Sequence, residues 1–579
     1  MTAQPAVELG RSLDTMLRAQ LDTFPESATR LGLDSGDHTA RRSRLDAASA
    51  DALAAYNRRQ RGFAQALRDI DPRALSPMQQ IDREAVLSQT EALLEGARLL
   101  PQGTPLDCQP YVVTQLSGAY QSLPDLLCTK HPLDSADDAH AFLARLAAFG
   151  PTLRDEAARI EADAAAGVLP PAFVIDTTVR QLQRLLDTAA ADSPIVQALG
   201  QRTQAAQIAC QGSKWAEKAT ALVQQSLQPA VQALMTLLHG LRTRASNDAG
   251  VWKLPGGEAW YANAIAVQTT TCMRADEIHT VGLGQVTEIT ARIDTVLRAQ
   301  GMASSATAST VAERLAALSS DERYVYPNDA AGKALLLQEL RALVAQMQAR
   351  LPEMFDPLPR AGLEVRGVPP EIEAGAPRGY YTPGPADGSR PGAFYANLRD
   401  TRDWKRWYAP SFAYHEGVPG HHLQVALALE TEGISMMRRT LWLAAYGEGW
   451  ALDAEQLADE MGLYETNPMG RVGYLQSMLF RAARLVVDTG LHARRWTRQQ
   501  AVAYLVSAVG ETTSRATAEV DRYCVMPAQA LSYKIGHLRW QQLRSASQAK
   551  SGSAFDLRRF HSDTLRWGAM PLGMLDRLA

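Results

Sequence analysis

The chain has 579 residues, of which 46% are hydrophobic and 21% charged, a composition typical of a folded globular protein and unlike that of a disordered chain. Lys and Arg number 59 against 62 Asp and Glu, so the chain lacks the basic excess with which proteins hold a nucleic acid backbone. No apolar run approaches the roughly 20 residues that span a bilayer, and five widely spaced cysteines exclude a small disulfide-rich protein.

Most of the chain is predicted to be helical. Apolar residues recur at helical spacing near 5–23, 49–70, 78–96, 135–165, 194–243 and 274–299. A further apolar stripe runs through residues 336–351, with Asn328 or Asp329 as its cap and Pro352 after its end. Closer to the C-terminus, Thr497 and Gln500 form a capping-box pattern ahead of an apolar helix.

Residues 352–410 depart from this helical pattern, because they are rich in Pro, Gly and aromatic residues. Within them, Leu363–Val368 and Ala393–Leu398 are predicted to be short strands. The sequence therefore predicts a mainly α protein with a small β-sheet. The alternative is a long connector that packs on the surface.

Length alone suggests about four domain-sized units, but a large helical enzyme also folds as one integrated unit. We expect an N-terminal helical lobe over residues 1–250 and a second lobe over residues 251–579. Cys108 and Cys128 are near enough in sequence for a disulfide, although buried thiols are the commoner state of scattered cysteines. The first residues lack the basic and apolar regions of a signal peptide. The sequence as it stands therefore predicts a soluble cytoplasmic protein, or a periplasmic or secreted one if a leader has been removed.

The segment SFAYHEGVPGHHLQ, residues 411–424, is the strongest candidate for a functional site. It contains His415, Glu416, His421 and His422, and only 11 His occur in the whole chain. Imidazole is a common zinc ligand, and a neighbouring Glu can act as general base toward a water on the metal. We therefore interpret His415 and His421 as zinc ligands and Glu416 as the base.

The spacing differs from the plain H-E-x-x-H pattern, because Pro419 stands at the position where the second His would lie. In an unbroken helix His421 would be about 120° off the His415 face, and His422 would be about 10 Å along the axis. Pro419 breaks a helix, so we expect a two-residue bulge that brings His421 to the metal. His422 remains the alternate ligand.

A third ligand is predicted in the segment GEGWALDAE, residues 447–455. Glu448 is the candidate, at or just before the first turn of a helix that starts near Leu452, and Asp453 or Glu455 could orient a ligand His. Taken singly, the histidines could be satisfied core residues and Glu448 a helix N-terminal charge. Their combination in one short window favours a metal site.

Three strings, HEGVPGHHLQ, GEGWALDAE and RYCVMPAQALSYKIG, resemble the bacterial DUF885 family, which is placed among zinc peptidase-like proteins of the gluzincin type. A more distant likeness is to carboxypeptidase Taq and the angiotensin-converting enzyme. The likeness implies a two-lobed helical fold with a small sheet beside a deep cleft, one Zn²⁺ per chain, and a catalytic tyrosine at Tyr523, with Tyr533 as runner-up. Two departures from the family pattern are Ala528 and Asp453, and the second puts the orienting role of Asp453 in doubt.

The expected function is zinc-dependent hydrolysis of peptide bonds in short peptides. For substrate binding we expect Ala393–Leu398 to act as an edge strand with Tyr395 or Asn397 nearby, and Arg390, Arg399 or Lys534 to bind a carboxylate; the alternative for each of these charges is solvated surface. Two other functions remain open: a metal-dependent amidohydrolase acting on a non-peptide or modified amino-acid amide, and a helical binding protein with a vestigial metal site.

Overall fold

The computed structural model describes residues 3–103, 106, 108–210, 214–369, 373, 376–384 and 390–578. Over these residues the protein is mainly helical with a small three-stranded sheet, which confirms the predicted fold class. None of the described helices is long and apolar enough to cross a membrane. The cysteines, all of which lie within the described ranges, form no disulfide bonds.

The chain divides into two compact units. The first contains Met1–Asp71 and Leu87–Trp260, and the second contains Pro72–Val86 and Tyr261–Ala579. Helices α4 (Pro77–Leu99) and α11 (Gly257–Thr269) each contain a boundary between the units.

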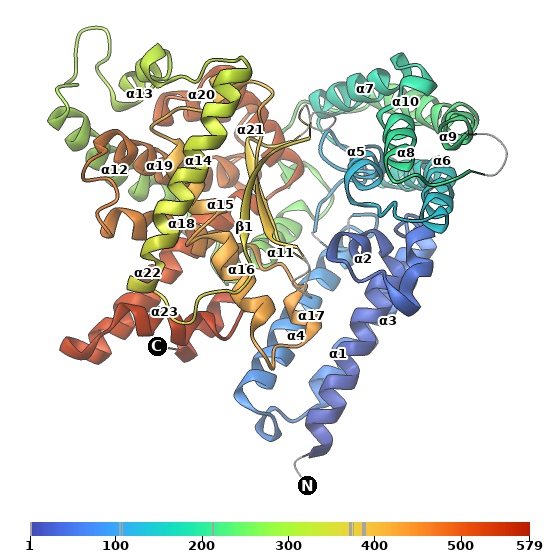
Figure 1. The fold of residues 1–579 in the computed structure, drawn as a ribbon, viewed down its shortest axis with the longest axis horizontal. Helices are drawn as coiled ribbons and strands as arrows, with labels where there is room; N and C mark the ends of the chain where they lie inside the picture. Colours follow the sequence, from blue (N-terminus) through green and yellow to red (C-terminus); the bar gives the residue numbers. More distant parts are fainter. Residues whose placement is uncertain are drawn as a thin grey trace. The chain divides into compact units, whose positions relative to one another are not determined.

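The first unit is helical. Its helices are α1 (Ala3–Thr23), α2 (Pro25–Leu31), α3 (Ala50–Asp69), α5 (Ala119–Asp125), α6 (Ala136–Ala165), α7 (Ala172–Asp187), α8 (Pro194–Ala205), α9 (Trp215–Leu222) and α10 (Gln228–Arg242). Helices α6, α7 and α10 pack together around an apolar core that includes Phe142 and Leu146 (Figure 1). The helical periodicity over residues 194–243 corresponds to three helices, and α8 ends where Gln207 takes up a left-handed backbone with φ of 55°.

The second unit combines helices with the sheet. Its elements are α12 (Ala275–Ala299), α13 (Val311–Ser319), α14 (Ala330–Arg350), β1 (Leu363–Gly367), β2 (Gly379–Thr382), β3 (Gly392–Ala396), α15 (Ala409–Glu416), α16 (His421–Glu430), α17 (Met436–Arg439), α18 (Ala444–Glu460), α19 (Pro468–Ala493), α20 (Arg498–Val509), α21 (Thr513–Val525), α22 (Ser532–Ser551) and α23 (Leu557–Leu565). Asp329 caps α14, and Thr497 with Gln500 forms the predicted capping box of α20.

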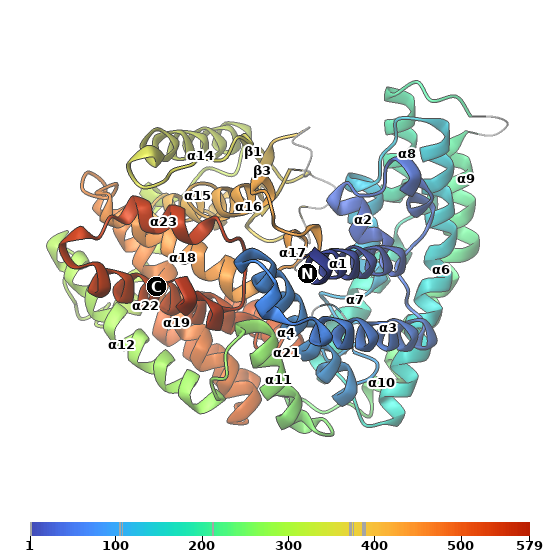
Figure 2. The same cartoon turned by 90° about the horizontal axis from the view of Figure 1, so that it is seen from below.

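Helix α19 is the most deeply buried element of the second unit. Every side chain from residue 472 to residue 492 is buried. It packs along α12 and also contacts α15, α18 and α20 (Figure 2). A helix that is enclosed on all sides is normally apolar throughout, yet α19 carries Arg481, Arg484 and Asp488 within this length.

The sheet has the strand order β1-β3-β2. Strand β3 is parallel to β1, with Phe394 opposite Val365, and antiparallel to β2, with Phe394 opposite Tyr381. Helix α14 packs against β1 (Figure 1). The prediction that Ala393–Leu398 is an edge strand is therefore wrong, because β3 has a neighbour on both sides and its ladder groups are already used. The edges belong to β1 and to β2, a strand that the sequence analysis missed.

Helices α18 and α22 approach each other at two glycines. A Cβ atom built on Gly449 would overlap the backbone of Gly536, and one built on Gly536 would overlap the carbonyl of Ala445. Only hydrogen atoms fit between the two backbones at this crossing. This close approach holds α18, which carries one residue of the site described below.

Gly449→Ala is expected to lower the free energy of unfolding by about 1–3 kcal/mol, because the new methyl group has to push two packed helices apart. Gly284→Ala in α12 is the matched control, since no atom lies within 4 Å of the position of its Cβ and removing a helix-interior glycine stabilises by roughly 0.5–1 kcal/mol. Urea unfolding of the two variants checks this. Equal midpoints would contradict the packing described here.

Candidate metal centre

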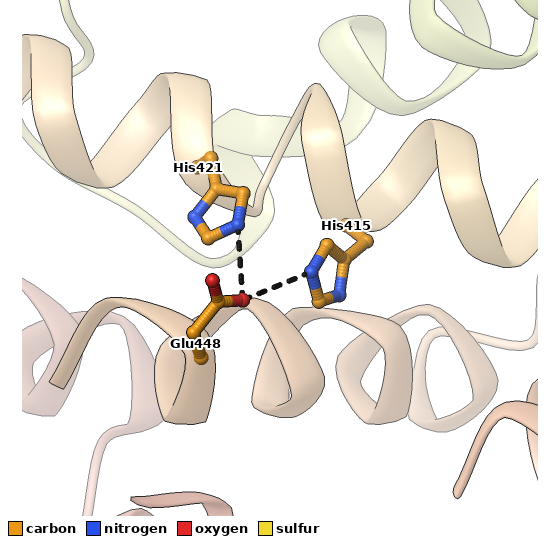
Figure 3. A group of neighbouring side chains, drawn as sticks. All are labelled: His415, His421 and Glu448. Carbon is orange, nitrogen blue, oxygen red and sulfur yellow. Dashed lines mark ion pairs between the residues drawn. The ribbon is translucent and has the colours of Figure 1, made fainter. Parts of the chain in front are cut away.

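Three buried side chains from three helices converge on one point in the second unit (Figure 3). His415 lies near the end of α15, His421 begins α16, and Glu448 lies in α18. The Nε2 atoms of both histidines are 3.4 Å from Oε2 of Glu448. One potential ligand atom of each residue lies within 4.8 Å of those of the other two.

The break between α15 and α16 brings the two histidines together. Helix α15 ends at Glu416, as Pro419 predicts, and His421 starts a new helix. Where we expected a two-residue bulge between Glu416 and His421, the chain leaves the helix and makes a four-residue turn over residues 417–420. A Cβ on Gly420 would overlap the carbonyl of His415, so only glycine allows this turn. The indole of Trp450 donates a hydrogen bond to the carbonyl of Pro419 at 2.9 Å, which ties the turn to α18.

Glu448 lies inside α18 and not before its first turn. The helix begins at Ala444, eight residues ahead of the predicted start at Leu452. Gly447 and Gly449 are both helical and both are packing positions: Gly447 contacts the ring of Trp442, and Gly449 faces α22. The close packing of these glycines outweighs their low helix propensity.

Glu455 fixes the orientation of His415. Nδ1–H of His415 donates to Oε1 of Glu455 at 2.8 Å, so Nε2 faces Glu448. The hydroxyl of Ser411 donates to the other oxygen of Glu455. Glu455 follows Glu448 by seven residues, two helical turns, and therefore lies on the same face of α18.

Asp453 does not take part in this arrangement, so its predicted role as an orienting residue is wrong. Five residues after Glu448, it lies about 140° around the helix, and its carboxylate accepts a hydrogen bond from Gln541 of α22. Burial raises the pKa of Asp453 to about 7.

Charge is strongly coupled within the cluster. Burial lowers the pKa of His415, but the carboxylates of Glu448 and Glu455 outweigh it and raise the pKa to about 9. Burial favours a neutral Glu448, yet His421 and His415 hold its pKa well below the usual value. At neutral pH Glu448 is therefore ionised and His415 is protonated, so a metal ion that binds here has to displace a proton from His415.

The geometry fits a divalent metal ion. At 3.4 Å neither imidazole makes a good hydrogen bond to Glu448, and Oε2 of Glu448 is a buried atom with no hydrogen-bond partner among the described residues. Zinc bonds of about 2.0–2.1 Å at tetrahedral angles place neighbouring ligand atoms roughly 3.3–3.4 Å apart. Two imidazole nitrogens and one carboxylate oxygen are also a donor set that catalytic zinc sites use.

His422, the alternate ligand, lies outside the cluster. Its Nε2–H donates to the carbonyl of Ala361 at 3.1 Å, and its Nδ1 accepts from the hydroxyl of Tyr381 at 3.1 Å. Both ring nitrogens therefore hold α16 to the sheet region. Next to each other on a helix, His421 and His422 point about 100° apart, so one reaches the cluster and the other cannot.

Glu416 is a buried carboxylate beside the cluster. It is 8% exposed and forms no hydrogen bond or ion pair with any residue in the described ranges. Its charge helps to raise the pKa of His415, which places it near the metal ligands. A carboxylate without a protein partner is free to exchange a proton with a bound water.

The two candidate tyrosines occupy different surroundings. Tyr523 is fully buried, and its hydroxyl accepts a hydrogen bond from Nε of Arg484 at 3.0 Å. Tyr533 is half-buried, and its ring lies nearly parallel to the imidazole of His415, with centroids 6.4 Å apart. Burial and the charge of Glu448 raise the pKa of Tyr533. Tyr533, ranked second from the sequence, is therefore the one beside the cluster.

The residues predicted to bind substrate are placed as follows. Arg390 and Arg399 are exposed. The ring of Tyr395 stacks on Tyr380 at 5.1 Å. The side chain of Asn397 donates to the backbone carbonyls of Glu373 and Ala376, which is a structural role. Lys534 is 3% exposed and directs its amine to Nδ1 of His537 at 3.3 Å. The expected carboxylate site at Lys534 stays a prediction.

The sequence analysis missed two arginines near the cluster, Arg481 and Arg484. Their guanidinium groups lie 5.8 and 4.7 Å from the ring centre of Tyr533. The available signal was their position, three residues apart in an otherwise apolar helix, FRAARLVV.

Glu455→Gln is expected to weaken metal affinity by roughly 10- to 100-fold, because the neutral amide no longer stabilises the orientation and basicity of His415. Asp453→Asn on the same helix is the control and should leave the affinity unchanged. Competition with a chromophoric chelator measures both variants. Equal affinities would show that Glu455 does not act through His415.

Comparisons with known proteins agree on the fold. Residues 25–578 match the family described as "Bacterial protein of unknown function (DUF885)", and no curated protein matches. The chain is similar to a "putative lipoprotein" from Colwellia psychrerythraea, with a TM-score of 0.93 and 29% identity over 99% of this chain and 98% of that one. It is also similar to a "putative lipoprotein of unknown function" from Shewanella oneidensis, with a TM-score of 0.71 and 16% identity over 98% of this chain and 99% of that one. This second likeness shows the fold alone. None of these descriptions names an activity.

Proposed function

The chain belongs to the DUF885 family of bacterial proteins of unknown function, and from its site we propose that it is a metal-dependent hydrolase of peptide bonds in short peptides. The observation that supports this most is the cluster of His415, His421 and Glu448 with a carboxylate next to the first ligand, Glu416, that has no hydrogen-bond or ion-pair partner among the described residues. A purely structural metal site has no use for such a carboxylate.

The three cluster residues would hold one divalent ion, and their donor types favour zinc. When bound, the metal would supply Lewis acidity toward water and toward the substrate carbonyl. Glu455 and Ser411 keep Nε2 of His415 available as a donor atom. Trp450 and Gly420 keep His421 in place through the turn.

Proton transfer is assigned to Glu416. Its carboxylate accepts a proton from the attacking water and passes it to the nitrogen of the leaving amine. Tyr533 is assigned to the developing oxyanion, to which its hydroxyl donates a hydrogen bond. Burial keeps this hydroxyl protonated at neutral pH, because it raises the pKa of Tyr533.

A digest of a mixed library of short peptides tests the proposal. The zinc-loaded protein should cleave peptides within the library, and mass spectrometry of the products shows the bond that is cut. Removal of metal with a chelator should abolish cleavage, and added zinc should restore it. A protein that is zinc-loaded and folded but cleaves no peptide would contradict the proposal.

A further inference from the structure

Two arginines of α19 have N–H groups that the described protein does not use. Nη1 of Arg481 donates to the hydroxyls of Tyr408 and Ser477, both at 2.8 Å. Arg484 donates to Tyr523 through Nε at 3.0 Å and to Glu519 through Nη2 at 3.3 Å. Nε of Arg481 and Nη1 of Arg484 are buried and have no hydrogen-bond partner among the described residues.

These unused donors are unusual for a protein interior. Arg481 is 8% exposed and Arg484 is 7% exposed, so water cannot freely solvate the two guanidinium groups. A buried donor without a partner costs free energy, and the cost is larger when the group is charged. An anion that accepts from both groups would remove this cost.

The neighbouring carboxylates do not bond to these two unused donors. Glu519 is shared by Arg484 and Arg522, at 3.3 and 3.1 Å. Glu511 pairs with Arg515 at 3.3 Å, and burial raises the pKa of Glu511 to about 7, so it is only partly ionised at neutral pH. Glu455 accepts from His415. These carboxylates therefore leave Nε of Arg481 and Nη1 of Arg484 without an acceptor among the described residues.

The ring of Tyr533 links this pair to the metal cluster. It lies 4.7 Å from the guanidinium of Arg484, 5.8 Å from that of Arg481, and 6.4 Å from the imidazole of His415. An extended peptide advances about 3.3–3.6 Å per residue. The guanidinium groups are thus within about three residues of a bond held at the metal cluster.

We propose that Arg481 and Arg484 bind a carboxylate of the substrate, one to three residues from the bond that is cleaved. This inference rests on the proposed function for the kind of ligand, a peptide. The planar guanidinium is well suited to a carboxylate, which accepts two N–H groups at once. The carboxylate is either the free C-terminus of a short peptide or an acidic side chain.

Binding to Glu416→Gln, measured by calorimetry in the presence of zinc, tests the proposal without turnover. The probes are acetyl-trialanine and its C-terminal amide, together with the amides of acetyl-Ala-Glu-Ala and acetyl-Ala-Gln-Ala. At least one carboxylate peptide should bind about tenfold or more tightly than its uncharged counterpart. The first pair reports on the C-terminus and the second on a side chain. Affinities within twofold in both pairs would overturn the proposal.

Arg481→Gln and Arg484→Gln in the same background should remove this preference. Arg471→Gln is the matched control, because Arg471 lies on the same helix but pairs with Asp459 at 2.6 Å. Arg484 also holds Tyr523 and Glu519, so if its variant does not fold, Arg481→Gln decides alone. A preference that survives in a folded Arg481→Gln protein would overturn the assignment.

Cleavage by the wild-type protein separates this inference from the proposed function. Cleavage of the library with no carboxylate preference would contradict the arginine site and support the proposed hydrolase. A carboxylate preference in binding that depends on Arg481, in a protein that cleaves no peptide, would support the arginine site and contradict the proposed hydrolase.

Discussion

Glu416→Gln is expected to lower peptide hydrolysis by roughly 10²- to 10⁴-fold, the usual contribution of a general base, while the protein still binds one metal ion. The amide has nearly the shape of the carboxylate but cannot accept the proton. Because Glu416 has no hydrogen-bond or ion-pair partner among the described residues, the substitution removes no such bond there and should leave the fold intact. Initial rates on one cleaved peptide, together with metal analysis of the same sample, give both results.

The control for this prediction is Asp453→Asn, which neutralises another buried carboxyl group of the second unit. Asp453 bonds to Gln541 and not to the cluster. Its variant should keep activity within a few-fold of wild type. Full activity in Glu416→Gln would end the assignment of this residue as the base, and an equal loss in both variants would indicate a general effect of charge or folding.

The second prediction compares two adjacent histidines. His421→Ala should lose the bound metal on dialysis, because only two ligands remain. His422→Ala should keep one equivalent, because both ring nitrogens of His422 bond to Ala361 and Tyr381 instead. Elemental analysis after dialysis against metal-free buffer measures the stoichiometry.

The comparison is informative because the two variants remove the same side chain from neighbouring, equally buried positions. His415→Ala and Glu448→Ala should behave like His421→Ala. Metal retained in His421→Ala and lost in His422→Ala would mean that the turn at Pro419 places the other ring in the cluster.

Local chemistry made the cluster predictable from the sequence. His415, Glu416 and His421 lie within seven residues, and Pro419 marks the break that separates their helices. Glu448 and Glu455 are two helical turns apart, so one periodicity places both on the same face. The helical class, the caps of α14 and α20 and two of the three strands also depend on short-range patterns, and they were predicted correctly.

Long-range packing decided the features that the sequence did not reveal. The order of strands depends on contacts between segments, so β3 was taken for an edge strand. The start of α18 depends on Gly449 meeting Gly536, a residue far along the chain. The ranking of Tyr533 over Tyr523 and the approach of Arg481 both depend on how α15, α21 and α22 pack against α19.

Charged residues occur in the interior of the second unit. Arg481 and Arg484 lie in the most enclosed helix, where an apolar residue would be more stable. Partners satisfy part of each guanidinium, and the two groups lie 5.8 and 4.7 Å from the ring centre of Tyr533. The arginine pair and the metal cluster together form the site that we propose for a short peptide with a negative charge.

The central claim is that His415, His421 and Glu448 hold a metal ion. Anomalous diffraction at the zinc absorption edge, from crystals of the zinc-loaded protein, tests it most directly. The account predicts one strong peak bonded to Nε2 of both histidines and to the carboxylate of Glu448, and no peak there in His421→Ala. A peak at His422, or no peak among the three side chains of the wild-type protein, would contradict it.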